Sequence, residues 1–215
     1  MSENFIKRIV SSLVLIPFIT FAIINGSYLF YFFLIICFLL ALQEWNKMSN
    51  NFYIKLFGTV FLLFSFYSFH QIRFNIDNEY MTLFFVIIIC ISTDIGGYVF
   101  GKIFKGIKLT KISPNKTYSG AIGGYLLSLI SVGLFFSMTS ISMSNDYFYF
   151  TFLITILLST VSQVGDIIIS YFKRKSNLKN SGDIIPGHGG ILDRIDGMIF
   201  VFPIFYLLIK FGIYT

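Results

Sequence analysis

Long apolar runs follow one another along most of this chain, and short polar connections separate them. Most of the runs approach the ~20 residues that a helix needs to cross the ~30 Å hydrocarbon core of a bilayer. In lipid every backbone N–H and C=O group must be satisfied internally, and the alternation typical of a transmembrane barrel is absent. The pattern therefore predicts an all-α, polytopic membrane helix bundle of about seven transmembrane helices, at about residues 9–25, 28–43, 56–70, 81–101, 119–137, 147–169 and 195–213.

Composition supports the same class of protein. Of the 215 residues, 56% are hydrophobic and only 12% are charged, a balance that excludes an ordinary soluble domain. We therefore expect an integral membrane protein with N-terminal transmembrane helices in residues 1–80. A C-terminal transmembrane region, residues 81–215, contains the candidate catalytic residues.

Basic residues predict the orientation of the helices. With the N-terminus in the cytoplasm, 14 of the 16 lysine and arginine residues fall in cytoplasmic segments, and Arg73 and Lys210 lie on the other side. The net charge of +6 is spread over short connections rather than gathered on one face, so nucleic acid is not an expected partner. Two long cytoplasmic connections, residues 102–118 and 171–193, are the candidate working surfaces.

Two aspartates lie inside predicted spans, Asp94 and Asp166. An ionisable residue at such a position normally faces a bundle interior or an aqueous cavity, and it indicates a functional site. The alternative is an ion pair with a lysine of a neighbouring helix that serves stability alone. At ~100° per residue, Gln163, Asp166, Ser170 and Lys173 form one stripe of a helix that leads to the cytoplasmic end.

A second pair of carboxylates, Asp193 and Asp196, shares a face at the start of the last predicted helix. Carboxylates are favoured at a helix N-terminus by the helix dipole, which is the simpler explanation. The other explanation is a divalent cation that joins Asp193 to Asp166. Mg²⁺ takes oxygen ligands, often one or two carboxylates together with substrate phosphates and waters.

Two polar loops could bind phosphate. Glycines in Pro-Gly-His-Gly-Gly, residues 186–190, would let backbone N–H groups approach an anion, with His188 as a general acid, a donor to phosphate or a turn residue. In residues 113–117, Ser113, Lys116 and Thr117 offer two hydroxyls and an ammonium to a polyphosphate. The glycine pairs at 97/101 and 120/124 are better explained by close helix packing than by nucleotide binding.

The order of these groups resembles a known family. The chain contains Ser170-x-x-Lys173-Arg174, Lys179, Pro186-Gly-His188-Gly-Gly and Asp193-Arg194-x-Asp196, in that order. This set closely resembles the signature of the phosphatidate cytidylyltransferases, also called CDP-diacylglycerol synthases. The earlier blocks around Asp94, Ser113–Thr117 and Gln163–Asp166 also look like conserved blocks of that family.

One position departs from the family pattern. The family usually has aspartate after the lysine at position 179, whereas this chain has Asn180. Either that carboxylate is dispensable, or Asp183 replaces it, or activity is altered.

The resemblance implies a Mg²⁺-dependent enzyme of phospholipid biosynthesis in a bacterial cytoplasmic membrane, with its active site facing the cytoplasm. It would transfer a cytidylyl group from CTP to phosphatidic acid, giving CDP-diacylglycerol and pyrophosphate. The implied metal ligands are Asp166 and Asp193, with Asp94 and Asp196 as further ligands or neighbours. Lys173 and Arg174 complete the implied catalytic set with Asp166 and Asp193. The implied substrate-binding residues are Ser113, Lys116, Thr117, Ser170, Lys179, His188, Gly189, Gly190 and Arg194.

Two other functions remain to be weighed. A CTP-using enzyme could act on another lipid phosphate, such as an ether lipid or a polyprenol, because the sequence does not show acyl selectivity. An ion or lipid transporter would also place carboxylates within the membrane. A transporter, however, has no use for the ordered cluster of basic residues, glycines and paired aspartates. A homodimer is a further expectation.

Overall fold

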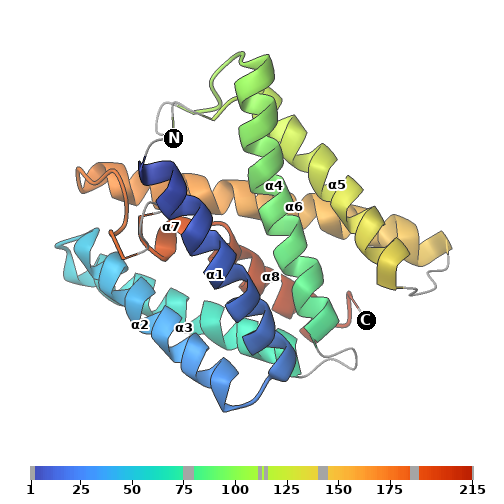
Figure 1. Cartoon of the computed structure of the whole chain (residues 1–215), viewed down its shortest axis with the longest axis horizontal. Helices are drawn as coiled ribbons and strands as arrows, with labels where there is room; N and C mark the ends of the chain where they lie inside the picture. The colour runs from blue at the N-terminus through green and yellow to red at the C-terminus, as the bar shows by residue number, and fades with distance from the viewer. Residues whose placement is uncertain are drawn as a thin grey trace. The chain divides into compact units, whose positions relative to one another are not determined.

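The computed structural model describes residues 3–74, 80–110, 113, 116–139, 145–184 and 189–214, without the side chains of residues 3–12 and 145–148. The regular structure in these ranges is entirely helical apart from isolated bridge residues, of which Lys108 and Thr117 pair antiparallel and Gly189 is a third (Figure 1). The predicted all-α class is therefore confirmed. The helices are α1 (Glu3–Asn25), α2 (Tyr28–Lys47), α3 (Phe52–Phe74), α4 (Tyr80–Phe104), α5 (Tyr118–Thr139), α6 (Asn145–Lys175), α7 (Leu192–Ile195) and α8 (Met198–Lys210).

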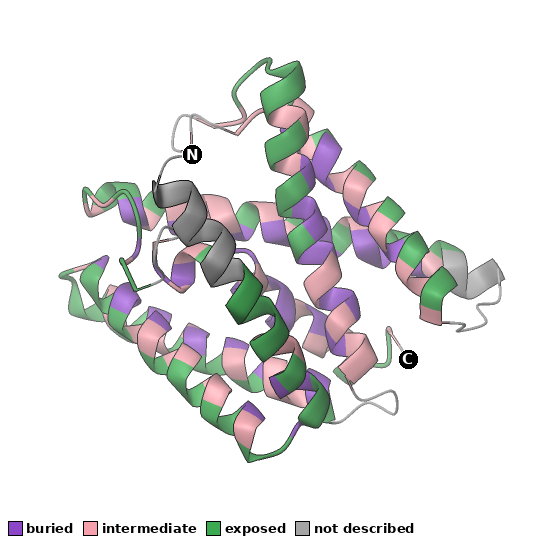
Figure 2. Ribbon diagram, in the orientation of Figure 1, coloured by how far each residue is buried: buried purple, intermediate pink, exposed green. Residues whose placement is uncertain are grey.

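Five of the described helical segments are long and apolar enough to cross a membrane: α2, α3, α4, α5 and the part of α6 from Tyr149 to Lys175. Shorter apolar segments lie at Leu13–Asn25 and in α8. Large apolar side chains such as Phe57, Ile95 and Ile122 are exposed, and exposed residues recur along these helices (Figure 2). Such surfaces are suited to lipid, so a polytopic membrane helix bundle is the class of this protein.

The last predicted helix, residues 195–213, is shorter in the structure, where α8 covers Met198–Lys210. Its end has a local cause. Gly212 has a left-handed backbone (φ +65°) and donates its N–H to Ile209 O, while Ile213 N–H bonds to Leu208 O. This Schellman arrangement satisfies the last carbonyls and stops the helix. At 1.5 Å per residue, the 13 residues of α8 extend about 20 Å.

The chain divides into two compact units, and each is described by itself. The first contains Met1–Tyr80 and Phe172–Asp196. Within it α2 packs against α1, α3 and α7, and α2 and α3 lie side by side (Figure 1). Trp45 packs so closely on α3 that a Cβ at Gly58 would lie 1.9 Å from its ring.

Arg73, one of the two basic residues predicted on the outer side, is buried at the end of α3. Its Nε donates to Ile23 O at 2.7 Å and its Nη2 to Ile24 O at 3.0 Å. The last carbonyls of a helix have no partner within the helix, so Arg73 satisfies two carbonyls at the end of α1.

The second unit contains Met81–Tyr171 and Gly197–Thr215. Its helices α4 and α5 approach so closely that side chains are excluded. A Cβ at Gly96 would lie 2.3 Å from Gly123 O, and a Cβ at Gly120 would lie 2.6 Å from Gly97 O. The contact of Gly120 with Gly97 joins the two predicted glycine pairs and confirms that small residues serve helix packing here, whereas Gly96 and Gly123 belong to neither pair.

We expect Gly96→Ala to lower the stability of the protein by about 2 kcal/mol, because the added methyl group overlaps backbone atoms that cannot move independently. The matched control is Gly133→Ala on α5, where an added Cβ meets nothing within 4 Å. The control should be neutral or slightly stabilising, since alanine is the better helix former. Thermal unfolding of both variants in detergent measures the difference, and equal midpoints would contradict the packing described above.

Candidate active site

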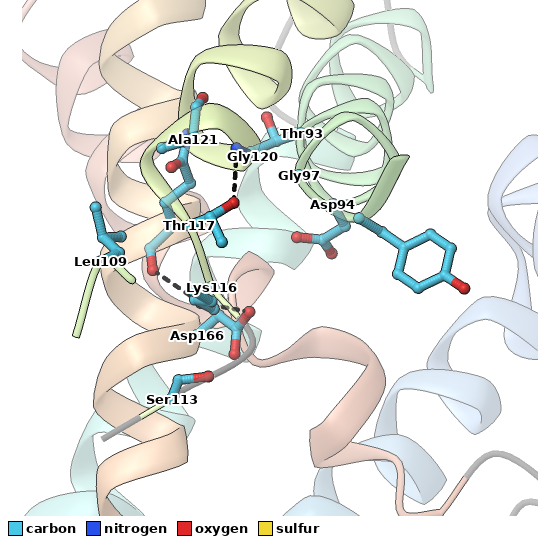
Figure 3. Close-up of a pocket in the computed structure, with 12 residues that line it drawn as sticks. Thr93, Asp94, Gly97, Leu109, Ser113, Lys116, Thr117, Gly120, Ala121 and Asp166 are labelled. Atoms are coloured by element: carbon cyan, nitrogen blue, oxygen red, sulfur yellow. Dashed lines mark hydrogen bonds and ion pairs between the residues drawn. The ribbon is translucent and has the colours of Figure 1, made fainter. Parts of the chain in front are cut away.

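A cavity of about 270 Å³ lies in the second unit, and residues from three helices and one loop line it (Figure 3). Helix α4 contributes Asp94, α6 contributes Asp166, and the loop before α5 contributes several polar groups. Sequence blocks that are far apart in the chain therefore meet here. Of the predicted site residues, those that line the cavity are Asp94, Ser113, Lys116, Thr117 and Asp166.

An ion pair spans part of this cavity. Lys116 Nζ lies 2.6 Å from Asp166 Oδ2 and 3.4 Å from Gln163 O, and both charged side chains keep about a quarter of their surface exposed (23% and 26%). Ser170 Oγ donates to Asp166 Oδ1 at 3.2 Å. Gln163, Asp166 and Ser170 thus lie on one stripe of α6, as the helical spacing predicts. The Asp94 side chain points into the same space from α4 (Figure 3).

The loop that carries Lys116 is held by its own backbone. Lys105 (φ 51°) and Gly106 (φ 105°) turn the chain after α4. Leu109 N–H then bonds to Lys116 O at 2.8 Å, and Tyr118 N–H bonds to Ile107 O at 3.1 Å. These bonds fix Lys116 at the edge of the cavity.

Thr117 has a structural partner as well as a place on the cavity wall. Its Oγ1 accepts a hydrogen bond from Gly120 N–H at 3.1 Å. Because α5 begins at Tyr118, this is the bond of an N-cap residue. The Thr117 hydroxyl, which the sequence predicts to bind polyphosphate, therefore has a capping role that was not predicted.

A second group of predicted residues meets in the first unit. Lys173 Nζ lies 2.7 Å from Asp193 Oδ1 and 3.9 Å from Asp196 Oδ2, and about a tenth of each side chain is exposed. Burial raises the pKa of the Asp193 carboxyl, but the hydrogen bond and charge of Lys173, together with two backbone N–H groups, hold that pKa below its usual value. Asp193 is therefore an ionised carboxylate paired with an ammonium.

The second oxygen of Asp193 binds the loop around it. Oδ2 accepts Ser181 N–H at 2.8 Å and Gly190 N–H at 3.1 Å. The Gly190 N–H, which the glycine run suggested for phosphate, thus has a carboxylate partner. Gly189 has φ 87°, and a Cβ there would lie 2.9 Å from Asp193 Oδ2, so this position requires glycine.

Sequence reasoning missed Glu44. This residue of α2 is completely buried (0% exposed). Its carboxylate accepts hydrogen bonds from Ile191 N–H at 2.9 Å, Leu192 N–H at 2.8 Å and the Ser181 hydroxyl at 2.8 Å. One signal was available, since Glu44 is an ionisable residue near the end of an apolar run.

The remaining predicted residues are placed as follows. Arg174 is exposed and donates to Leu178 O at 3.2 Å, in the segment that follows α6. Lys179 and Arg194 are also exposed, and His188 lies outside the described residues. The exposed Asn180 lies beside Gly189, since a Cβ built on that glycine would be 3.4 Å from Asn180 Cβ.

The carboxylates that line the cavity are ligands of the kind that Mg²⁺ binds. Asp94 and Asp166 line one space and offer oxygen ligands, as Mg²⁺ prefers. Across the part of the chain that the structure describes, no group of three or more His, Cys, Asp or Glu side chains could hold a metal ion. The other two predicted ligands, Asp193 and Asp196, stay predictions. Three protein donors already occupy Asp193, whose two oxygens have about four lone-pair positions.

Comparison with known proteins assigns the chain that carries this site to a family. Residues 50–212 match the model of the cytidylyltransferase family, so the chain belongs to that family. A phosphatidate cytidylyltransferase of Rickettsia typhi is 38% identical over 95% of this chain and 91% of its own. One of Rickettsia felis is 35% identical over 96% and 92%, and one of Bacillus subtilis is 38% identical over 71% and 56%.

The Lys173–Asp193 pair gives a prediction about stability. Lys173→Met should destabilise the protein by about 3 kcal/mol, because it leaves a buried carboxylate without its cation. Lys179→Met is the matched control on an exposed lysine, with an expected change within about 0.5 kcal/mol. Thermal unfolding in detergent compares the two. Equal losses would show that the pair adds nothing beyond an ordinary surface charge.

Proposed function

We propose that this protein is a phosphatidate cytidylyltransferase, which converts CTP and phosphatidate into CDP-diacylglycerol and pyrophosphate. One observation carries the proposal. In a chain of the cytidylyltransferase family, three separate polar blocks of the sequence line a single cavity among apolar helices. A cavity of this kind suits a reaction between a water-soluble nucleotide and a lipid.

The reaction places modest demands on acid–base chemistry. Phosphatidate is a phosphate monoester with a second pKa of about 6, so it is largely a dianion near neutral pH. One of its oxygens attacks the α-phosphorus of CTP, a new P–O bond forms, and the bond to the β-phosphate breaks to release pyrophosphate. No general base is needed. The protein must align the two phosphates and offset their negative charge.

The cavity residues are suited to that work. Lys116 brings an ammonium to the cavity, and its bond to Asp166 holds it at a defined place. Ser113, on the same wall, adds a hydroxyl that can donate to a phosphate oxygen. Asp94 and Asp166 would hold Mg²⁺, which offsets phosphate charge when it is bound. Arg174, Lys179 and Arg194 are exposed cations of the first unit, and they stay predicted contacts of the phosphates.

The same proposal includes the location of the enzyme. The apolar helices make it an integral membrane protein, and its relatives are bacterial. We place it in the bacterial cytoplasmic membrane with the site facing the cytoplasm, since 14 of the 16 basic residues then lie on that side. CTP is available there.

Purified protein in detergent, with labelled CTP, phosphatidate and Mg²⁺, should form a CDP-lipid. Asp166→Asn should lower the rate at least about a hundredfold, because both Lys116 and the proposed metal lose a charged partner. The variant should match wild type in gel filtration, which excludes misfolding as the cause. Product that does not depend on Asp166, or a preference for polyprenyl phosphate over phosphatidate, would contradict the proposal.

Metal removal tests the cofactor separately. Excess EDTA should abolish product formation, and added Mg²⁺ should restore it. Asp94→Asn should raise the Mg²⁺ concentration needed for half-maximal rate by about tenfold or more, because it removes one of two carboxylates from the cavity. Full activity in EDTA would rule out the metal role, and an unchanged Mg²⁺ requirement in Asp94→Asn would exclude that residue as a ligand.

A further inference from the structure

Two carboxylates, the fully buried Glu44 and the largely buried Asp193, hold residues at and beside the glycine run, and only Asp193 belongs to the family signature. Asp193 accepts the N–H groups of Ser181 and Gly190. Glu44, which is far away in the sequence, accepts the N–H groups of Ile191 and Leu192 and the hydroxyl of Ser181. Together the two side chains accept five hydrogen bonds from this short part of the chain.

Ser181 and Gly190 connect Glu44 to Asp193. Ser181 donates its N–H to Asp193 Oδ2 and its hydroxyl to Glu44 Oε2. Gly190 donates to Asp193, and a Cβ there would lie 2.4 Å from Glu44 Oε2 and 2.2 Å from Ser181 Oγ. A shift of Glu44 must therefore move groups that orient the Asp193 carboxylate.

The contacts select a carboxylate rather than an amide at position 44. Oε1 accepts one backbone N–H, and Oε2 accepts another together with the Ser181 hydroxyl. Glutamine has one acceptor oxygen and an NH₂ group, so one backbone N–H would face a donor. A buried N–H without an acceptor costs about 1–3 kcal/mol. The loop could avoid that cost by moving away.

We infer that Glu44 is a positioning residue of the cytidylyltransferase site, which fixes the backbone at Ser181 and residues 190–192 and thereby orients Asp193 and its partner Lys173. Glu44 contacts neither substrate in this role. The inference rests on the proposed function and on the roles that the family resemblance implies for Asp193 and Lys173 in that reaction.

Glu44→Gln in the full-length protein is the main test, with two measurements. Hydrogen exchange followed by mass spectrometry should show at least about tenfold faster exchange in peptides that cover residues 189–196, because one of the two amides that Glu44 binds then faces the glutamine NH₂ group and loses its acceptor. The kcat, per folded protein, should fall at least about tenfold, with KM for CTP changed less than about threefold. Small displacements of aligned groups have effects of this size.

Arg73→Gln is the matched control. Arg73 is also buried and also binds backbone groups of the same unit, but its partners are Ile23 and Ile24 at the end of α1. It should lower the unfolding temperature as Glu44→Gln does, with unchanged kcat and unchanged exchange in residues 189–196. Such a result separates loss of position from loss of stability.

Ser181→Ala serves as a milder second variant if Glu44→Gln does not fold. It removes the hydroxyl bond to Glu44 and keeps the backbone bond to Asp193. Its kcat should fall about threefold or more, with faster exchange in the same peptides.

Two results would overturn the inference: exchange that stays at the wild-type rate, or faster exchange with wild-type kcat. The exchange measurement needs no substrate. It therefore distinguishes a failure of this inference from a failure of the proposed activity.

Discussion

A backbone N–H that is shielded from water must find an acceptor inside the protein, and this requirement shapes the polar part of the chain. In the loop before α7 the acceptors are side-chain carboxylates, Glu44 and Asp193, rather than other backbone groups. Carboxylates are strong acceptors, and their burial is tolerated because each has several donors. At Ser181 and Gly190, two described positions of this loop, the backbone is therefore fixed although neither belongs to a helix.

Backbone carbonyls that have no partner within a helix need hydrogen-bond donors in the same way. Arg73 donates to two carbonyls at the end of α1, and Arg174 donates to a carbonyl just beyond α6. At the start of α5 the side chain of Thr117 supplies the acceptor instead. Several charged and polar residues near the helix ends therefore serve the backbone first, and only some remain for substrate.

Much of the fold could be predicted because the length of an apolar run and the bilayer thickness act locally on the sequence. Each of the seven predicted runs corresponds to a helix of the structure, and the glycine pairs pack as expected. The error at the end of α8 came from Gly212, whose left-handed turn stops a helix within an apolar run. Hydrophobic periodicity does not detect such a turn.

The candidate site was predictable in part. Asp94, Lys116 and Asp166 were found because charged groups in or beside apolar helices are conspicuous, and they do line one cavity. The partners of Asp193 were not predictable, because backbone N–H groups leave no trace in residue identity. Glu44 was not predicted because its partners, from Ser181 to Leu192, lie 137 to 148 positions later in the sequence.

The space at Gly190 bears on how the glycine run should be interpreted. Glycines in such a run suggest room for an anion to approach the backbone, yet at Gly190 that room is filled by the Glu44 carboxylate and the Ser181 hydroxyl. Natural variation at positions 44 and 190 should then be correlated, since a larger residue at one requires a smaller one at the other. The family pattern begins at Ser170 and so does not include Glu44, although Glu44 is one reason why position 190 must be glycine.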